Sequence, residues 1–416
     1  MNFKNKSLFM LALRGATLAS KFLLITYLAK YSTFGILAEY SIIAVTVSYL
    51  LYVLGFDFYS YSVREIIKTT LHKSGGLLLN QFSFYLVMYL LSIPLIYLLK
   101  LYGIIDNNII FLFYFVLVSE HLAQEFMRLL VINNKAFLAN LQLFIRSAAW
   151  IYIYIYYSYV SGDTSIELLL ISWTGGNIIA IIFTLIDLKN IDKKTLKKWR
   201  IDFRWIFKGV KVAIPLLCAT LMLRGVFVSD RYLLKFLSTT QDLAIYSFFS
   251  NMANSLIAFV DAAVIMQFYP KLIAAYQENQ PTIYTQQLKK FKAKVIIVGG
   301  CVSLMLIFAI PLLCIYLGHK EYLESLLIFY ILLASVFVYS YGLIYHYELY
   351  SRGKDSLILL ATFISFVFGV SIQYVFGMYL QGIGIAIGVL MSSCILFITK
   401  LICLKHVKRD KNEIYY

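Results

Sequence analysis

Long apolar runs recur along the whole chain and constrain its fold more than any other feature. A helix needs about 20 largely apolar residues to cross the hydrocarbon core of a bilayer. Twelve runs of about that length cover residues 8–28, 34–55, 78–99, 109–131, 141–160, 166–187, 209–233, 243–268, 295–317, 324–348, 356–377 and 383–403. The sequence therefore predicts an all-α polytopic membrane protein with about twelve transmembrane helices.

Composition excludes the soluble classes of protein. Of 416 residues, 61% are hydrophobic and only 14% are charged, whereas roughly a quarter of the residues in a soluble domain are charged. A net charge of +16 would suggest nucleic-acid binding in a soluble chain, but here the basic residues lie between apolar runs. None of the five cysteines forms a CxxC pair, so neither a zinc site nor a disulfide framework is predicted.

The distribution of lysine and arginine predicts the orientation. If the N-terminus is cytoplasmic, the connections on that side carry 26 of these residues, and those on the opposite side carry four, Lys30, Lys100, Lys235 and Lys320. Because cytoplasmic connections are enriched in positive charge, we expect both termini in the cytoplasm. No connection on the opposite side exceeds about ten residues, so no outer domain is expected.

A basic stretch at 188–208 divides the chain into an N-lobe (1–187) and a C-lobe (209–404), with a cytoplasmic tail at 405–416. This stretch and 271–294 are typical of segments lying on the membrane surface, with Trp199, Trp205 and Phe291 expected to face lipid.

The two lobes contain similar short motifs in the same order. YLAKY at 27–31 matches YLLKF at 232–236, LAEYS at 37–41 matches LAIYS at 243–247, and Ile-Pro-Leu occurs at 93–95 and at 310–312. Each pair falls on the equivalent span with the same orientation. The pattern predicts two six-helix lobes related by a parallel internal repeat.

Charged residues inside predicted spans are the candidate functional residues, because intramembrane charge usually faces a cavity or a partner. The candidates for a substrate cavity are Arg14, Lys21, Arg146, Arg224 and Arg231. Those for ion coupling are Glu120, His121, Glu125, Arg128 and Asp261.

Cationic residues lie at corresponding places in the two lobes. Arg14 and Lys21 are seven residues apart in the first span, and Arg224 and Arg231 are seven apart in the seventh. Such stripes suit a basic, water-filled cleft between the lobes that takes an anion such as a phosphate or diphosphate. In the alternative interpretation, Arg128, Arg146 and Arg231 extend toward the interface from near helix ends.

His121, Glu125 and Arg128 fall on one face of the fourth span. The Glu125–Arg128 pair at i and i+3 suits either ion coupling or packing alone. The chain lacks the GxxxxGK[ST], GxSxG and HExxH motifs, which favours a transporter without ATPase activity over an enzyme. No cofactor is expected, and H⁺ or Na⁺ is the candidate coupling ion.

Five longer motifs stand out along the chain: FGILAEYSIIAVTVSYLLYVLGFDFYSYSVREI at 34–66, SDRYLLKFLSTTQDLAIYSFFSNM at 229–252, IPLLCIYLGHKEYLESL at 310–326, SRGKDS at 351–356 and QGIGIAIGVLMSS at 381–393. Together they resemble one family, the O-antigen or polysaccharide repeat-unit flippases of the multidrug/oligosaccharidyl-lipid/polysaccharide (MOP) exporter superfamily.

The resemblance implies a flippase of the bacterial inner membrane that acts in O-antigen, lipopolysaccharide or other surface-polysaccharide biosynthesis. Its cargo would be an undecaprenyl-diphosphate-linked oligosaccharide, moved from the cytoplasmic to the periplasmic leaflet by alternating access. Its implied partners are membrane lipids and the polymerase and chain-length proteins of the same pathway; no nucleic acid is expected.

Two alternatives stay open. One is a different cargo on the same fold, a lipid-linked peptidoglycan precursor or a drug, although the cationic stripes disfavour a cationic drug. The other is a membrane O-antigen polymerase or glycosyltransferase, which the short outer connections disfavour.

Overall fold

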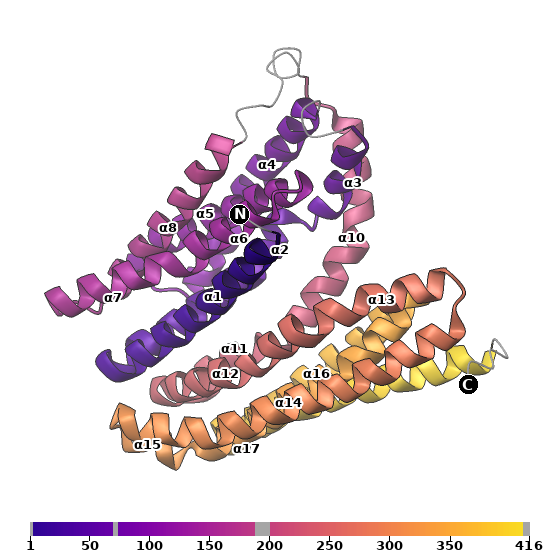
Figure 1. Ribbon diagram of the computed structural model, residues 1–416. Helices are drawn as coiled ribbons and strands as arrows, with labels where there is room; N and C mark the ends of the chain where they lie inside the picture. Colours follow the sequence, from indigo (N-terminus) through magenta and orange to yellow (C-terminus); the bar gives the residue numbers. More distant parts are fainter. Residues whose placement is uncertain (1–2, 70–73, 188–199, 411–416) are drawn as a thin grey trace. The chain divides into compact units, whose positions relative to one another are not determined.

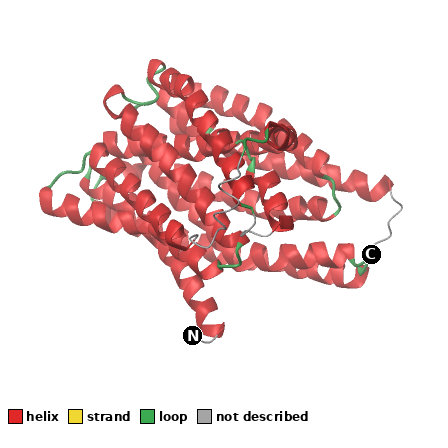
Figure 2. Ribbon diagram, turned by 90° about the horizontal axis from the view of Figure 1, so that it is seen from above, coloured by secondary structure: helices red, strands yellow, loops and turns green. Residues whose placement is uncertain are grey.

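The computed structural model describes residues 3–69, 74–187 and 200–410. Every regular element in these ranges is helical (Figures 1 and 2). The elements before residue 200 are α1 (Phe3–Tyr31), α2 (Phe34–Gly55), α3 (Tyr59–Thr69), α4 (Gly75–Leu101), η2 (Asn107–Ile109), α5 (Ile110–Ile132), α6 (Ala136–Phe144), the π-turn η3 (Ile145–Ala149), α7 (Trp150–Ser161) and α8 (Ile166–Asp187). Those after it are α10 (Phe203–Val226), α11 (Ser229–Leu237), α12 (Thr240–Val260), the π-turn η5 (Asp261–Ile265), α13 (Met266–Gln277), α14 (Pro281–Leu317), α15 (Lys320–Glu324), α16 (Leu326–Ser351) and α17 (Asp355–Asp410).

Within the described ranges, ten helical segments are long and apolar enough to cross a membrane. One of them, α17, consists of two helices, because Gln381 has non-helical torsion angles (φ 46°, ψ −125°). The 29-residue α1 coincides with the remaining predicted span. The all-α polytopic prediction is confirmed, and a fold with about twelve transmembrane helices agrees with these elements.

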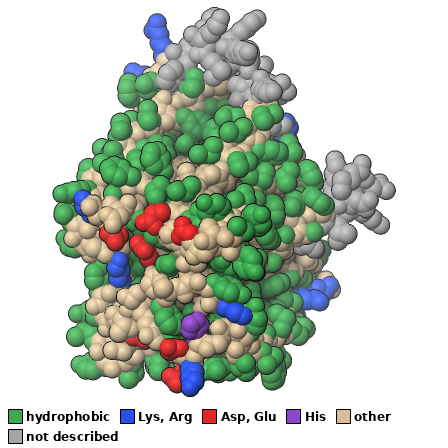
Figure 3. All heavy atoms as spheres, turned by 90° about the vertical axis from the view of Figure 1, so that its left-hand side faces the viewer, with side chains coloured by type: hydrophobic (Ala, Val, Ile, Leu, Met, Phe, Trp, Pro, Cys, Tyr) green, Lys and Arg blue, Asp and Glu red, His purple; other side chains and the backbone are tan. Residues whose placement is uncertain are grey.

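Large apolar side chains cover much of the surface, as expected where lipid replaces water. In Figure 3, hydrophobic side chains cover most of the face shown, and charged side chains form small groups among them. Phe111, Phe308 and Tyr379 are 77%, 70% and 81% exposed. Such exposure would be costly for a protein dissolved in water.

The chain divides into two compact units, Met1–Leu221 and Met222–Tyr416, and the boundary lies inside α10. The predicted boundaries of the lobes, the linker and the tail stay predictions, and residues 188–199 of the linker and 411–416 of the tail lie outside the described residues.

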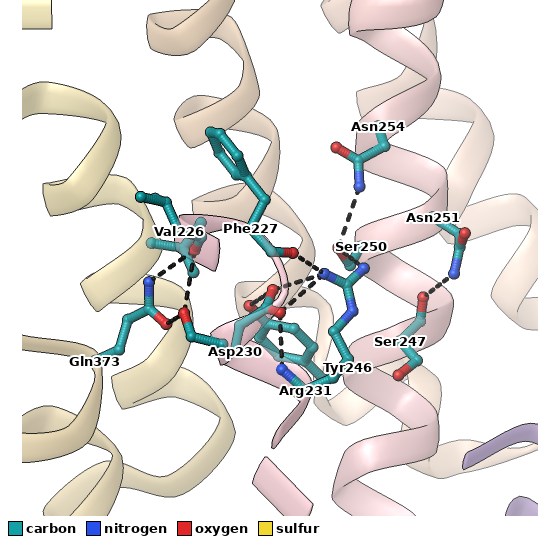
Figure 4. Close-up of polar contacts among 12 residues, drawn as sticks. Val226, Phe227, Asp230, Arg231, Tyr246, Ser247, Ser250, Asn251, Asn254 and Gln373 are labelled. Carbon is teal, nitrogen blue, oxygen red and sulfur yellow. Dashed lines mark hydrogen bonds and ion pairs between the residues drawn. The ribbon is translucent and has the colours of Figure 1, made fainter. Parts of the chain in front are cut away.

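One predicted span is wrong as a single helix. The run at 209–233 is divided at Phe227–Val228, where α10 ends and α11 begins (Figure 4). A break frees backbone carbonyls that an uninterrupted helix would satisfy. Gln373 Nε2 donates to the Val226 carbonyl at 3.2 Å, and the Arg231 guanidinium donates to the Phe227 carbonyl at 3.1 Å. Apolar periodicity could not reveal this break, because side chains from distant positions stabilise it.

The predicted lipid-facing position of Phe291 is also wrong. Its side chain is fully buried and stacks on Phe268, with ring centroids 5.8 Å apart. The reason is that α14 begins at Pro281, well before the predicted span, and packs along α13. Trp205 packs against Phe58 and Tyr61 at 5.4 and 5.3 Å, and Trp199 lies outside the described residues.

Matching helix starts accompany the sequence repeat. Thr33 caps α2 by accepting a hydrogen bond from Ile36 N, and Thr239 caps α12 in a capping box with Asp242. Each threonine lies four residues before the leucine of its motif, LAEYS or LAIYS. Pro94 and Pro311 of the third motif both lie inside long helices, α4 and α14.

Candidate functional site

Two cationic residues of α1 lie at the surface of the first unit. Arg14 and Lys21 are both exposed, and the Arg14 Nε donates to Asn140 Oδ1 of α6 at 2.8 Å. They lie seven residues apart, so the helix places them on one face, two turns from each other. Both candidates therefore remain accessible to a ligand that reaches this face of the unit.

The Glu120 carboxylate and the Arg146 guanidinium lie within electrostatic range of Lys21 on α1. The Arg146 guanidinium forms an ion pair with Glu120, with 3.0 Å between nitrogen and oxygen, and these side chains are 8% and 11% exposed. Lys21 interacts electrostatically with both groups. The other Glu120 oxygen accepts a hydrogen bond from the Trp173 indole at 2.9 Å. We name Lys21, Glu120, Arg146 and Trp173 the Glu120 cluster.

Arg146 occupies a π-turn, η3, that interrupts the helical run from α6 to α7. π-turns are uncommon and are found frequently at functional sites. Within the described part of the chain, the buried Nε of Arg146 has no hydrogen-bond partner. Since a guanidinium carries five N–H donors, Arg146 has donors to spare beyond its ion pair with Glu120.

A second polar cluster lies on α5 one turn further on. The Glu125 carboxylate is 2% exposed and pairs with the Arg128 guanidinium. It also accepts hydrogen bonds from Gln81 Nε2 at 3.0 Å and Tyr85 Oη at 2.9 Å. Arg128 lies over the ring of Tyr59 at 3.5 Å. A buried carboxylate with this many donors is held firmly in place.

His121 belongs to the same cluster. We name Gln81, Tyr85, His121, Glu125 and Arg128 the Glu125 cluster. Its Nδ1 is 2.7 Å from the Tyr89 hydroxyl, and its Nε2 is 3.8 Å from Glu125 Oε1. Gly55 leaves room for the ring, because a Cβ atom there would lie 2.7 Å from Nε2. The structure brings His121, Glu125 and Arg128 together as their spacing predicts, whereas Glu120 joins a different cluster. Their role in ion coupling stays a prediction.

In the second unit the two predicted arginines have different surroundings. Arg224 is exposed, and Tyr339 of α16 lies within electrostatic range of both Arg224 and Asp261. Asp261 begins the π-turn η5.

Arg231 is 5% exposed and pairs with Asp230 at 2.8 Å (Figure 4). The expectation of one continuous stripe through Arg224 and Arg231 is therefore wrong, because the helix break separates them.

Sequence reasoning missed the neutral partners of these charges. Trp173, Asn140, Gln81, Tyr85 and Tyr89 hold the charged groups in place. Gln81 lies within an apolar run and Asn140 directly precedes one, so both could have been noticed as polar residues in the sequence. Nothing in the sequence distinguishes Trp173 or the two tyrosines from interfacial aromatic residues. Across the described residues, no group of three or more histidine, cysteine or acidic side chains could hold a metal ion.

Comparisons with known proteins define the fold. No family model and no curated protein sequence matches the chain. A solved structure of an inward-facing MATE family multidrug resistance transporter of the MOP superfamily is similar, with a TM-score of 0.75, 14% identity and coverage of 95% of this chain and 96% of that one. The chain is thus a multi-pass membrane protein with the fold of a transporter.

Two further structures resemble the chain along most of its length. The lipid II flippase MurJ, in an inward closed conformation, has a TM-score of 0.72 at 15% identity, over 96% of this chain and 87% of that one. The MATE transporter VcmN of Vibrio cholerae has a TM-score of 0.61 at 15% identity, over 99% and 97%. At these identities the similarity defines the fold, and the cargo follows only from further argument.

Proposed function

We propose that this protein is an inner-membrane flippase for undecaprenyl-diphosphate-linked oligosaccharide repeat units of O-antigen or a related surface glycan. It would move them from the cytoplasmic to the periplasmic leaflet by alternating access. The fold it shares with a lipid II flippase and with MATE transporters supports export of a membrane-borne cargo. The motifs that resemble repeat-unit flippases support the choice of glycan.

The observation that carries the proposal is the excess of positive charge around α1. Lys21 and Arg146 share one carboxylate, that of Glu120, and Arg14 lies two turns away on the same helix face. Cations in a site of low dielectric constant attract an anion strongly, and arginine binds phosphate oxygens with two parallel hydrogen bonds. A diphosphate matches this charge, whereas a cationic drug would be repelled.

The roles of the individual residues follow from their surroundings. Arg14, Lys21 and Arg146 would bind the diphosphate in the first unit, and Arg224 is an exposed cation of the second unit. We assign Arg231 to packing, because it is buried and its terminal nitrogens donate to Asp230, Ser250 and the Phe227 carbonyl. The Glu125 cluster and Asp261 would provide H⁺ or Na⁺ coupling, and no cofactor is required.

The test replaces the exposed arginines and follows the cargo. Hydrogen bonds to charged groups contribute about 1.5–3 kcal/mol each, so Arg14→Ala and Arg224→Ala should each weaken diphosphate binding about ten- to a hundredfold. Lipid-linked repeat units should accumulate on the cytoplasmic side at normal protein abundance. Lysine at either position should restore part of the transport, because it keeps the positive charge but lacks the planar guanidinium that binds two phosphate oxygens at once.

Lys100→Ala is the matched control. Lys100 lies near the end of α4, over the ring of Tyr97 at 5.7 Å, and is not a member of the Glu120 cluster. Its loss should leave transport unchanged. Normal surface glycan at normal abundance in a variant lacking both Arg14 and Arg224 would refute the proposed cationic site.

A lipid-linked peptidoglycan precursor is the second candidate cargo, favoured by the fold similarity to the lipid II flippase. Both cargos carry the same diphosphate, so the cationic residues suit either. Removing the gene and identifying the lipid-linked sugar that accumulates distinguishes them. An accumulating repeat unit supports the proposal, and an accumulating peptidoglycan precursor supports the alternative.

A further inference from the structure

The Glu120 carboxylate occupies the place that an anionic ligand of Arg146 would take. It lies 3.0 Å from the Arg146 guanidinium and interacts electrostatically with Lys21. These two cations are on different elements, α1 and the π-turn η3. A phosphate group that binds both cations must therefore displace Glu120 or share them with it.

Two features show that Glu120 leaves part of the charge and of the hydrogen-bonding capacity of Arg146 and Lys21 unused. Among the described residues, none accepts a hydrogen bond from the Arg146 Nε, although the side chain is only 8% exposed. An unpaired buried donor is unfavourable. The side chain of Lys21 is exposed, so a ligand can reach it. One carboxylate facing two cations also leaves a net positive charge.

Trp173 provides a second anchor for the carboxylate. Its indole donates to Glu120 Oε2 at 2.9 Å, whereas Arg146 pairs with Oε1. An indole N–H is a donor only, so it can retain the carboxylate after the guanidinium turns to another acceptor. Trp173 is itself stacked on Trp150, with ring centroids 5.6 Å apart and planes 5° apart, which fixes the position of the indole.

We propose that Glu120 is an exchangeable counter-ion that pairs with Arg146 and attracts Lys21 in the absence of cargo, and that it yields both cations to the phosphate oxygens of an anionic lipid. Its return to Arg146 competes with the bound phosphate and promotes release of the cargo. This inference rests on the proposed function for its ligand, a phosphate-bearing lipid headgroup. It gives Glu120 a role in the substrate site instead of the ion-coupling role that the sequence suggested.

The decisive variant is Glu120→Gln, which keeps the size of the side chain and an oxygen for Trp173 but removes the competing charge. The purified full-length protein in detergent is titrated with undecaprenyl diphosphate and, separately, with inorganic diphosphate. We expect binding about tenfold tighter than wild type for both probes, because one charge-assisted interaction no longer competes. Reconstituted flipping should become slower, since release loses its competitor.

Three companion variants make the result specific. Glu120→Asp retains the charge but shortens the reach to Arg146, so it should give a smaller gain in affinity, and it serves if Glu120→Gln folds poorly. The double variant Arg146→Ala, Glu120→Gln should bind neither probe more tightly than wild type, because the guanidinium that the phosphate would take is absent. Glu65→Gln is the matched control, because Glu65 pairs with Lys68 on α3 at 2.8 Å and its loss should change neither affinity nor flipping.

The outcomes separate this inference from the proposed function. Unchanged or weaker binding of both probes in well-folded Glu120→Gln, or no binding of either probe to any variant, overturns the counter-ion role. Flipping of the repeat unit by wild type without a gain in affinity in Glu120→Gln refutes the inference alone. A gain for inorganic diphosphate without flipping of any repeat unit by wild type supports the inference and refutes the proposed function.

Discussion

The Arg231–Asp230 pair gives the sharpest test of which cations serve packing and which serve the cargo. Asp230 is 1% exposed and Arg231 is 5% exposed. Arg231 donates to both Asp230 oxygens at 3.0 and 2.8 Å and to Ser250 Oγ at 2.6 Å. The Tyr246 hydroxyl donates to Asp230 Oδ2 at 3.0 Å (Figure 4). The pair thus links α11 to α12 beside the helix break.

Arg231→Ala leaves a buried carboxylate without its cation. Breaking a buried ion pair from one side costs about 3–5 kcal/mol, which corresponds to a loss of roughly a hundredfold to a few thousandfold in the ratio of folded to unfolded protein. We expect a large fall in membrane abundance and unfolding at a lower SDS fraction. The double variant Asp230→Asn, Arg231→Met should recover most of the loss, because no uncompensated charge remains.

The assay is a titration of purified protein from mild detergent into SDS, followed by helical signal, together with the abundance in membranes. Arg14→Ala, which changes an exposed cation, is the comparison and should unfold close to wild type. If Arg231→Ala has the free energy of unfolding and the abundance of wild type but does not move cargo, the packing role is refuted. Arg231 would then be assigned to the substrate site, as the sequence suggested.

Three further predictions concern packing, coupling and topology. Gly55→Ala should destabilise the first unit by about 1–3 kcal/mol, because the new methyl meets His121 Nε2; Gly15→Ala, with nothing within 4 Å of its Cβ, is the control and should be neutral or slightly stabilising in thermal unfolding. Glu125→Gln should fold but transport slowly and lose its dependence on external pH if Glu125 carries the coupling proton, whereas wild-type pH dependence would remove it from that role. Reporter fusions after Lys198 and Tyr416 should report cytoplasm and one near Asp163 the opposite side, and an outer signal at Lys198 would contradict the two-lobe scheme.

The sequence alone predicted most of the transmembrane architecture, because crossing a bilayer demands long apolar runs whatever their neighbours are. The predicted runs at 34–55 and 166–187 coincide with α2 and α8. The helical period also placed His121, Glu125 and Arg128 on one face, since contacts three or four residues apart depend on local geometry alone. Membrane orientation and the cargo remain predictions at this level.

Tertiary structure decided which charges are paired. Arg224 and Arg231 look equivalent in the sequence, but α10 ends between them. Gln373, 147 residues further along the chain, stabilises this end by donating a hydrogen bond to the Val226 carbonyl. Glu120 and Glu125 are five residues apart, yet one joins Arg146 of η3 and the other Arg128 and Tyr85. Such partners lie far apart in the chain or on opposite helix faces, and only packing brings them within hydrogen-bonding distance. The sequence therefore determines which residues are charged within the membrane, and the fold determines which of them remain accessible to a ligand.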